Sequence, residues 1–241
     1  MPVRHGMTVG ELARLFNAEN RIGADLTIVP VKGWHREQWF DETGIPWTSP
    51  SPNMRTMNEA TLYPGVCLIE SSNVSVGRGT DTPFEHVGAP WMDGRRLAAE
   101  LNARRLPGVR FYPTSFTPTT SKYKGEPCNG VFMVVIDREA LRAVRVGVEL
   151  IAAVYRLHPE KFEIDKVLRL LGSPTVLARI KSGDDPSRVA AAWSDDEARF
   201  RLLRAKYLLY RCRRRGASES TACQMGIADL PSVNAPPNAI A

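Results

Sequence analysis

The sequence lacks any long hydrophobic run. None of its apolar stretches approaches the roughly 18 consecutive residues that a membrane span requires. Charged side chains, among them Arg4, Glu11 and Arg14, occupy the amino-terminal segment where a signal peptide would be apolar. We therefore expect no membrane span, and no export signal in the chain as written.

Motifs for metal or redox chemistry are missing as well. The cysteines lie too far apart for a CxxC motif, at Cys67, Cys128, Cys212 and Cys223. The histidines are scattered singly and lack HExxH spacing, at His5, His35, His86 and His158. We expect free thiols, two of them buried, and neither a metal nor any other cofactor.

The net charge of +6 comes without a nucleic-acid-binding motif. Much of the positive charge lies in one late segment, at Arg199, Arg201, Arg204, Lys206, Arg211, Arg213, Arg214 and Arg215. Such a run is usually a solvated helix face, here continuing into a basic tail, and it would also attract an anionic cell-wall polymer. Because the segment contains no recognisable nucleic-acid-binding motif, we expect no nucleic-acid partner.

Local patterns predict an alternation of helices and strands. Capping boxes at Thr8 and Thr56 predict a helix to about Asn20 and a short helix that Pro64–Gly65 ends. Apolar and β-branched runs predict strands over 26–31, 66–69, 109–116 and 131–136. Helices are predicted over 93–104, from 141 to 155, near 166–171 and 175–181, and from Ser194 onward. This order favours the α/β class, as a mixed α+β domain.

The segment from Glu70 to Glu85 carries the most chemistry. Glu70 follows the predicted strand 66–69, and α/β proteins bind ligands at the carboxyl ends of such strands. Small polar residues and glycines surround Arg78, which suits recognition of hydroxyl, amide and carboxylate groups. The segment matches neither the Walker spacing nor GxGxxG. A tight loop in which Glu70 and Arg78 simply pair with each other is an open alternative.

Several stretches in a fixed order resemble a known family. They are Arg4–Thr8 with Gly10–Ala13, Gly23–Leu26, Trp39–Gly44 running to Ser51–Met54, Tyr63–Glu85, Gly88–Trp91, Phe116–Pro118, and Lys122–Tyr123 continuing to Cys128–Val131. Together these stretches extend roughly over residues 2–211 and resemble the bacterial exo-β-N-acetylmuramidases. Two departures from the family pattern stand out: Ser71–Ser72 replaces a glycine-threonine pair, and Val76 replaces a glutamate.

The resemblance implies a glycoside hydrolase that releases terminal N-acetylmuramic acid from the non-reducing end of peptidoglycan fragments. It implies a periplasmic or cell-wall location. The family pairs an amino-terminal Rossmann-like domain with a carboxyl-terminal domain, and the chain begins about where the second domain should begin. We therefore expect residues 1–212 to form the carboxyl-terminal type of domain and to require the missing Rossmann-like domain as a partner. Residues 213–241, basic and then rich in Pro and Ala, are expected to be a disordered tail.

Glycoside hydrolysis generally uses two carboxyl groups, one as acid and one as base or nucleophile. Glu70 and Glu85 are the candidates for these catalytic positions. The candidate substrate-binding residues are Asn53, Asn73, Arg78, Thr80 and Lys122. Arg78 suits the lactyl carboxylate of muramic acid, and the asparagines and Thr80 suit hydroxyl or acetamido groups. A non-catalytic muramyl-sugar-binding or partner-docking module, or an inactive truncated product, is the alternative.

Overall fold

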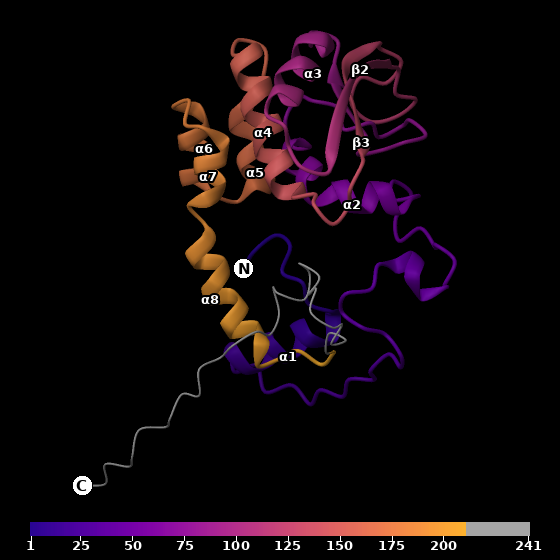
Figure 1. Cartoon of the computed structure of the whole chain (residues 1–241), viewed down its shortest axis with the longest axis vertical. Coiled ribbons are helices and arrows are strands. Elements are labelled where there is room, and N and C mark those ends of the chain that lie inside the picture. The colour runs from indigo at the N-terminus through magenta and orange to yellow at the C-terminus, as the bar shows by residue number, and fades with distance from the viewer. Residues whose placement is uncertain (211–241) are drawn as a thin grey trace, which may run out of the picture. The chain divides into compact units, whose positions relative to one another are not determined.

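The computed structural model describes residues 1–210 and divides them into two compact units. The large unit comprises residues 1–5 and 44–196, and the small unit comprises residues 6–43 and 197–210 (Figure 1). The predicted tail over 213–241, with Cys212 and Cys223, lies outside the described residues. Of the two described cysteines, Cys128 is buried and Cys67 is half-buried, and both are free thiols.

The large unit is built on a three-stranded antiparallel sheet. Its strands are β1 (His86–Ala89), β2 (Val109–Phe116) and β3 (Cys128–Val135), in the order β1-β3-β2. The predicted strands over 109–116 and 131–136 are confirmed, and β1 is an additional strand that follows the loop after Glu70. Sheet and helices together confirm the mixed α+β class.

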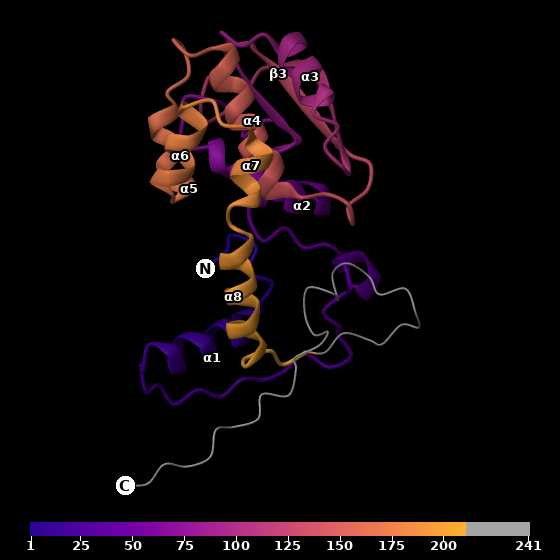
Figure 2. The same ribbon diagram turned by 60° about the vertical axis from the view of Figure 1, so that its left-hand side comes forward.

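Helices cover this sheet and pack on one another. They are α3 (Gly94–Ala103), α4 (Ala143–Leu157), α5 (Leu168–Leu171) with the preceding 3-10 turn η3 (Ile164–Val167), α6 (Pro174–Lys181) and α7 (Pro186–Ala191). Helix α3 packs on β2 and β3, whereas α6 and α7 pack on α4. Figure 2 shows α5, α6 and α7 gathered around α4. The helices predicted over 93–104, 141–155, 166–171 and 175–181 are therefore confirmed.

The predicted strand over 66–69 is wrong. Helix α2 (Met57–Val66) passes through Pro64 and continues directly into the 3-10 turn η2 (Cys67–Ile69). A short apolar run fits a buried helical segment as well as a buried strand, so periodicity could not separate the two. The run is buried on helical turns instead, with Leu68 and Ile69 in the core.

Pro64–Gly65 does not end α2, contrary to the sequence prediction. Gly65 lies where α2 crosses α4: a Cβ at this position would sit 1.8 Å from the carbonyl oxygen of Ala143. Gly147 of α4 faces Gly65 in the same way, with the Gly65 carbonyl oxygen 2.3 Å from where its Cβ would lie. Gly65 therefore lies inside α2 and allows α2 and α4 to pack closely. It does not terminate the helix.

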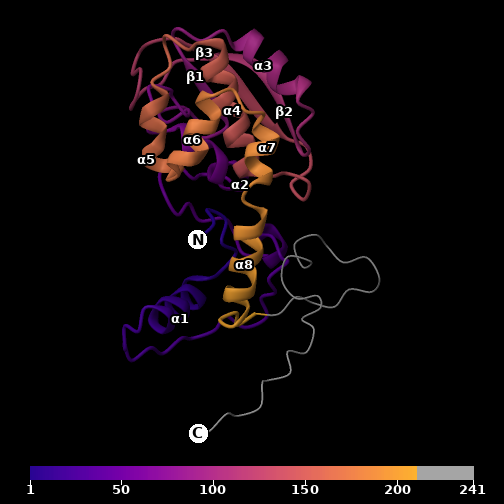
Figure 3. The same cartoon turned by 90° about the vertical axis from the view of Figure 1, so that its left-hand side faces the viewer.

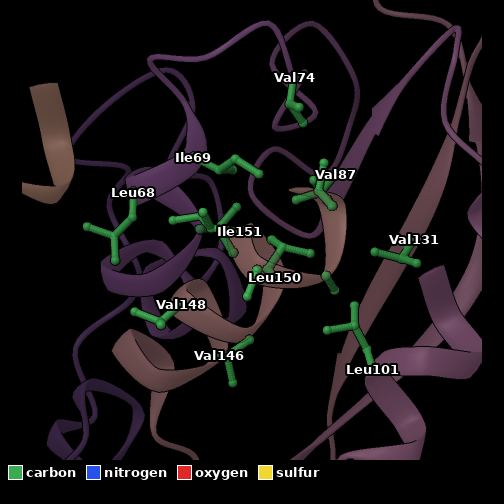
Figure 4. Packing of buried hydrophobic residues seen from close by; sticks show 14 of the residues in the cluster. Leu68, Ile69, Val74, Val87, Leu101, Val131, Val146, Val148, Leu150 and Ile151 are labelled. Atoms are coloured by element: carbon green, nitrogen blue, oxygen red, sulfur yellow. The ribbon is translucent and has the colours of Figure 1, made fainter. Parts of the chain in front are cut away.

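One hydrophobic core joins these elements. Figure 4 shows Val131 of β3, Leu101 of α3, Ile151 of α4 and Ile69 of η2 pointing into it, and all four side chains are buried. Full burial of each such aliphatic side chain stabilises the fold by about 1.5–3 kcal/mol. The loop after η2 is anchored in the same core through Val74.

The small unit contains α1 (Val9–Glu19), the 3-10 turn η1 (Phe40–Thr43) and the larger part of α8 (Ser194–Ala205). The capping box predicted at Thr8 is present, as is the one at Thr56 in the large unit. The predicted strand over 26–31 is wrong, because these residues lie in no regular structure and no other strand occurs in the described part of this unit (Figure 3). Strand pairing needs a neighbour that the local sequence cannot supply.

A buried carboxylate links separate segments of the small unit. Glu11 is fully buried, and its Oε2 accepts the Thr8 N–H at 2.8 Å. Its Oε1 accepts from the Arg36 guanidinium, from the Leu209 N–H at 2.7 Å and from the Tyr210 N–H at 3.4 Å. Burial alone would raise the pKa of Glu11, but these donors outweigh burial and the pKa is lowered.

Among the described helices, none has the length and hydrophobicity to cross a membrane.

Candidate functional site

The candidate site is the loop between η2 and β1, over residues 70–85. Glu70 caps the 3-10 turn η2. The prediction that it lies at the carboxyl end of a strand is therefore wrong. The loop nevertheless lies beside the sheet, because Ser75 and Gly88 of β1 exchange two backbone hydrogen bonds of 2.8 and 3.0 Å. Glu70 therefore opens a loop that is fixed to the sheet at its middle.

Two glycines shape this loop, as the sequence predicts. Gly77 and Gly79 have φ angles of +77° and +84°, a region that favours glycine. Gly79 also contacts the neighbouring loop: a Cβ there would lie 2.5 Å from the Thr120 nitrogen, and the Thr119 N–H donates to the Gly79 carbonyl at 2.9 Å. The backbone of the loop is thus held from two sides.

Glu70 and Arg78 form an ion pair through the Arg78 Nε. The pairing alternative considered from the sequence is therefore what the structure shows. Both side chains remain partly open, with 21% of Glu70 and 32% of Arg78 exposed. The terminal guanidinium nitrogens of Arg78 donate to no described residue, so they are available to an anionic group that reaches the loop.

Lys122 joins this pair from the loop between β2 and β3. Its Nζ donates to the backbone carbonyl of Glu70. Burial lowers the pKa of Lys122, with the nearby Glu70 carboxylate opposing that effect. Two cationic groups therefore surround one carboxylate, and the cluster carries a net positive charge.

Asn73 and Thr80 have structural partners. The Asn73 amide donates to the Lys161 carbonyl at 2.8 Å and accepts the Glu163 N–H at 2.9 Å. The Thr80 hydroxyl donates to the Gly77 carbonyl at 2.6 Å. Both side chains therefore hold the loop in shape, which is a different role from the direct hydrogen bonding to sugar that the sequence analysis assigned to them.

Two of the predicted site residues lie apart from the pair. Asn53 is half-buried in the loop before α2, and no hydrogen bond within the described residues links its side chain to Glu70 or Arg78. Glu85 is only 6% exposed, and the polar side chains of Asn58 and Thr56 act to lower the pKa of its carboxyl group. The described contacts do not bring Glu70 and Glu85 together.

Glu85 has a second buried carboxyl group as its neighbour. Burial raises the pKa of Glu85, and the charge of Glu59 raises it further. Glu59 is fully buried, and its Oε1 has no hydrogen-bond partner among the described residues. Burial and the neighbouring carboxyl group thus make Glu85 a weaker acid than an exposed glutamate.

Val76 is one of the two departures from the family pattern that the sequence shows. Its side chain is 3% exposed and belongs to the hydrophobic core. Residue 76 therefore faces the hydrophobic core in this chain.

Aromatic residues at the site were missed by the sequence analysis. Phe84 lies with its ring 5.1 Å from the Arg78 guanidinium carbon and packs edge-on against Tyr63, with ring centroids 4.8 Å apart. The Tyr123 hydroxyl donates to the Asn73 carbonyl at 2.8 Å. Phe84 and Tyr123 have φ angles of +64° and +59°, a conformation that non-glycine residues rarely adopt and that sequence does not signal.

Two grooves in the described part of the chain are lined by residues other than Glu70 and Arg78. One groove of about 430 Å³ is lined by Tyr155, Pro159, Phe162, Glu163, Ile164, Asp165, Lys166 and Lys181. It borders the loop, since the Ser71 hydroxyl donates to the Lys166 carbonyl at 2.7 Å. Another of about 600 Å³ belongs to the small unit and is lined by residues of α1, of 21–26 and of 206–207.

Comparison with known families gives two matches along the chain. Residues 61–210 match the model described as exo-β-N-acetylmuramidase NamZ, C-terminal, and residues 1–58 match its N-terminal counterpart. The two matches meet between residues 58 and 61, within the segment 1–212 that is expected from the sequence to form one domain.

Individual relatives agree with these matches. The chain is 42% identical over 213 residues to peptidoglycan β-N-acetylmuramidase NamZ of Bacillus subtilis (strain 168), a match that covers 87% of this chain and 51% of the relative. Two solved structures of DUF1343 family proteins from Bacteroides fragilis NCTC 9343, each 28% identical, superpose with TM-scores of 0.77 and 0.66. They cover 85% and 87% of this chain, and 56% and 57% of their own. The chain thus spans about half the length of the relatives that it matches.

Proposed function

This chain belongs to the exo-β-N-acetylmuramidase NamZ family, and we propose that it supplies one wall of a site for the terminal N-acetylmuramic acid of peptidoglycan fragments. The wall consists of Glu70, Arg78 and Lys122. The observation that carries the proposal is the partly open guanidinium of Arg78, whose terminal nitrogens donate to no described residue.

The chemistry of muramic acid fits this wall. Its lactyl group carries a carboxylate, which distinguishes it from N-acetylglucosamine. A guanidinium with two free nitrogens binds a carboxylate through parallel charge-assisted hydrogen bonds, and a nearby ammonium group adds to the attraction. Glu70 holds Arg78 through its Nε, so the guanidinium is oriented before a sugar arrives.

Hydrolysis at the non-reducing end is the finer part of the proposal. Glu70 is the catalytic candidate that is partly exposed, whereas Glu85 is buried. Because glycoside hydrolysis requires two groups on either side of the scissile bond, the second group would come from the half of the family's length that this chain does not match. We also propose that the reaction takes place outside the cytoplasm, where peptidoglycan fragments arise.

Sugar binding is tested on the chain itself by calorimetry with the methyl glycosides of N-acetylmuramic acid and N-acetylglucosamine. The chain should bind the first sugar and bind the second at least tenfold more weakly. Arg78→Ala should remove this preference, whereas Arg55→Ala should not; Arg55 is exposed, pairs with Asp81 and donates to the Pro52 carbonyl at 3.3 Å. Equal affinity for both sugars would refute the assignment of Arg78.

Catalysis is tested by assaying the chain alone and with the unmatched portion of the Bacillus subtilis relative. Hydrolysis only in the mixture, abolished by Glu70→Gln, is the expected result. Turnover by the chain alone would show that its own residues suffice and would contradict the requirement for a second half.

A non-catalytic muramyl-sugar-binding module is the second candidate. The separation of Glu70 from the buried Glu85 favours it, since the described chain presents only one open carboxylate at the loop. This candidate predicts sugar binding without hydrolysis in either form of the assay.

A further inference from the structure

The Arg78 side chain is held at two points. Its Nε donates to the Glu70 carboxylate, and its guanidinium carbon lies over the Phe84 ring, 5.1 Å from the ring centre. The negative face of an aromatic ring attracts a cation at this distance. The ion pair alone fixes one nitrogen of the guanidinium, so the ring is the contact that can fix the direction of the other two.

Phe84 is itself firmly fixed. Its side chain is 1% exposed and belongs to the hydrophobic core, and Tyr63 packs edge-on against its ring. The Phe84 N–H donates to the Val76 carbonyl at 2.7 Å, which closes the loop across residues 77–83. Arg78 lies inside that closed stretch. The arginine therefore rests on a rigid surface that its own loop supplies.

The backbone at Phe84 adopts a conformation that favours glycine. Its φ angle is +64°, and the loop has glycines, Gly77 and Gly79, at its other two positions with positive φ. A non-glycine residue in this region is strained, and such residues cluster at ligand-binding sites. Burial calls only for an apolar side chain at position 84, which leucine also provides. The contact with Arg78 calls for an aromatic face.

We propose that Phe84 is a positioning residue whose ring holds the Arg78 guanidinium with its two terminal nitrogens directed away from Glu70. Because a guanidinium is planar and rigid, a carboxylate at Nε and a ring beneath the group leave the terminal nitrogens little freedom. Recognition of the lactyl carboxylate through these nitrogens rests on the proposed function, whereas the positioning of Arg78 does not.

The test changes the charge distribution of the ring and keeps its ring shape. Pentafluorophenylalanine, placed at position 84 through a reassigned stop codon, withdraws negative charge from the ring face, and para-fluorophenylalanine withdraws less. Exchange of the Arg78 Nε proton with water is followed by NMR spectroscopy without any sugar, and Arg78→Lys identifies the signal. Exchange should become faster with each step of fluorination, by about threefold or more in the pentafluoro protein.

Calorimetry with the methyl glycosides of N-acetylmuramic acid and N-acetylglucosamine gives the second readout. The preference for the muramyl sugar should fall by about threefold or more in the pentafluoro protein and in Phe84→Leu. Pentafluorophenylalanine in place of Phe111, which is 2% exposed on β2, is the matched control and should change neither readout. Thermal unfolding shows which proteins are folded, and the para-fluoro protein decides the question if the pentafluoro protein is not.

The possible results separate positioning from simple core packing. Unchanged proton exchange in the folded fluorinated proteins would overturn the proposal, even if the sugar preference fell, because the ring would then act on the sugar and not on Arg78. An equal effect of the change at Phe111 would also overturn it, since general loosening of the core would explain both. If exchange follows fluorination but the unmodified chain shows no preference for the muramyl sugar, the proposed function fails and the positioning role stands.

Discussion

Replacement of Glu11 by Gln should unfold the small unit locally. The carboxylate accepts hydrogen bonds from Thr8, Arg36, Leu209 and Tyr210, and it is fully buried. The neutral amide removes the charge opposite Arg36 and places N–H groups among donors. Removing one partner of a buried ion pair costs about 3–5 kcal/mol, and we expect about 3 kcal/mol because one acceptor oxygen remains.

The assay is amide hydrogen exchange at Leu209, whose N–H donates directly to Glu11. A loss of about 3 kcal/mol corresponds to exchange more than a hundredfold faster, since each 1.4 kcal/mol is a factor of ten. Glu19→Gln is the matched control on the same helix, because Glu19 is exposed and accepts only from the Tyr207 hydroxyl at 2.5 Å. This control should change protection by less than threefold.

The pH dependence gives a second readout for Glu11. Its pKa is lowered in the folded chain, so its stabilisation is complete above the ordinary value of 4.5 and is lost as pH falls through the lowered pKa. In Glu11→Gln, this loss of Leu209 protection in acid should disappear. If the variant exchanges like the wild type at pH 7, the buried carboxylate does not hold the small unit together and the reasoning is refuted.

Two other changes probe the large unit. Gly65→Ala should lower the free energy of unfolding by about 3 kcal/mol and Tm by about 6–12 °C, because the new Cβ would overlap the Ala143 carbonyl. An unchanged Tm would contradict the tight crossing of α2 and α4. Glu85→Gln should make stability less sensitive to a rise in pH above the ordinary glutamate value of 4.5, because a raised carboxyl pKa gives stability that is present below 4.5 and is lost as pH rises through the raised pKa. The measurement is Tm as a function of pH from below 4.5 to neutrality, and an equal fall in both proteins would show that Glu85 is not the group responsible.

Features encoded by a few neighbouring residues were predictable. The capping boxes at Thr8 and Thr56 were recognised because each needs only a hydroxyl and a glutamate three residues apart. Strands β2 and β3 and helix α4 were recognised from their apolar patterns. The glycines at 77 and 79 pointed correctly to a tightly turned loop.

Features that depend on distant partners were not predictable in the same way. The run 66–69 and the run 26–31 both look like strands, yet the first is packed as helical turns and the second has no strand beside it. The burial of Glu85 beside Glu59 depends on how α2 meets the loop, which no spacing reveals. The pairing of Glu70 with Arg78 was considered only because both residue types occur in one polar segment.

The anchoring of loop 70–85 through Ser75 and Gly79 has a kinetic consequence. A surface that is already ordered loses little conformational entropy when something associates with it. Association would then proceed at the rate of productive encounter, without a slow rearrangement step. Substitutions along the loop should accordingly change the dissociation rate constant of a bound ligand far more than its association rate constant.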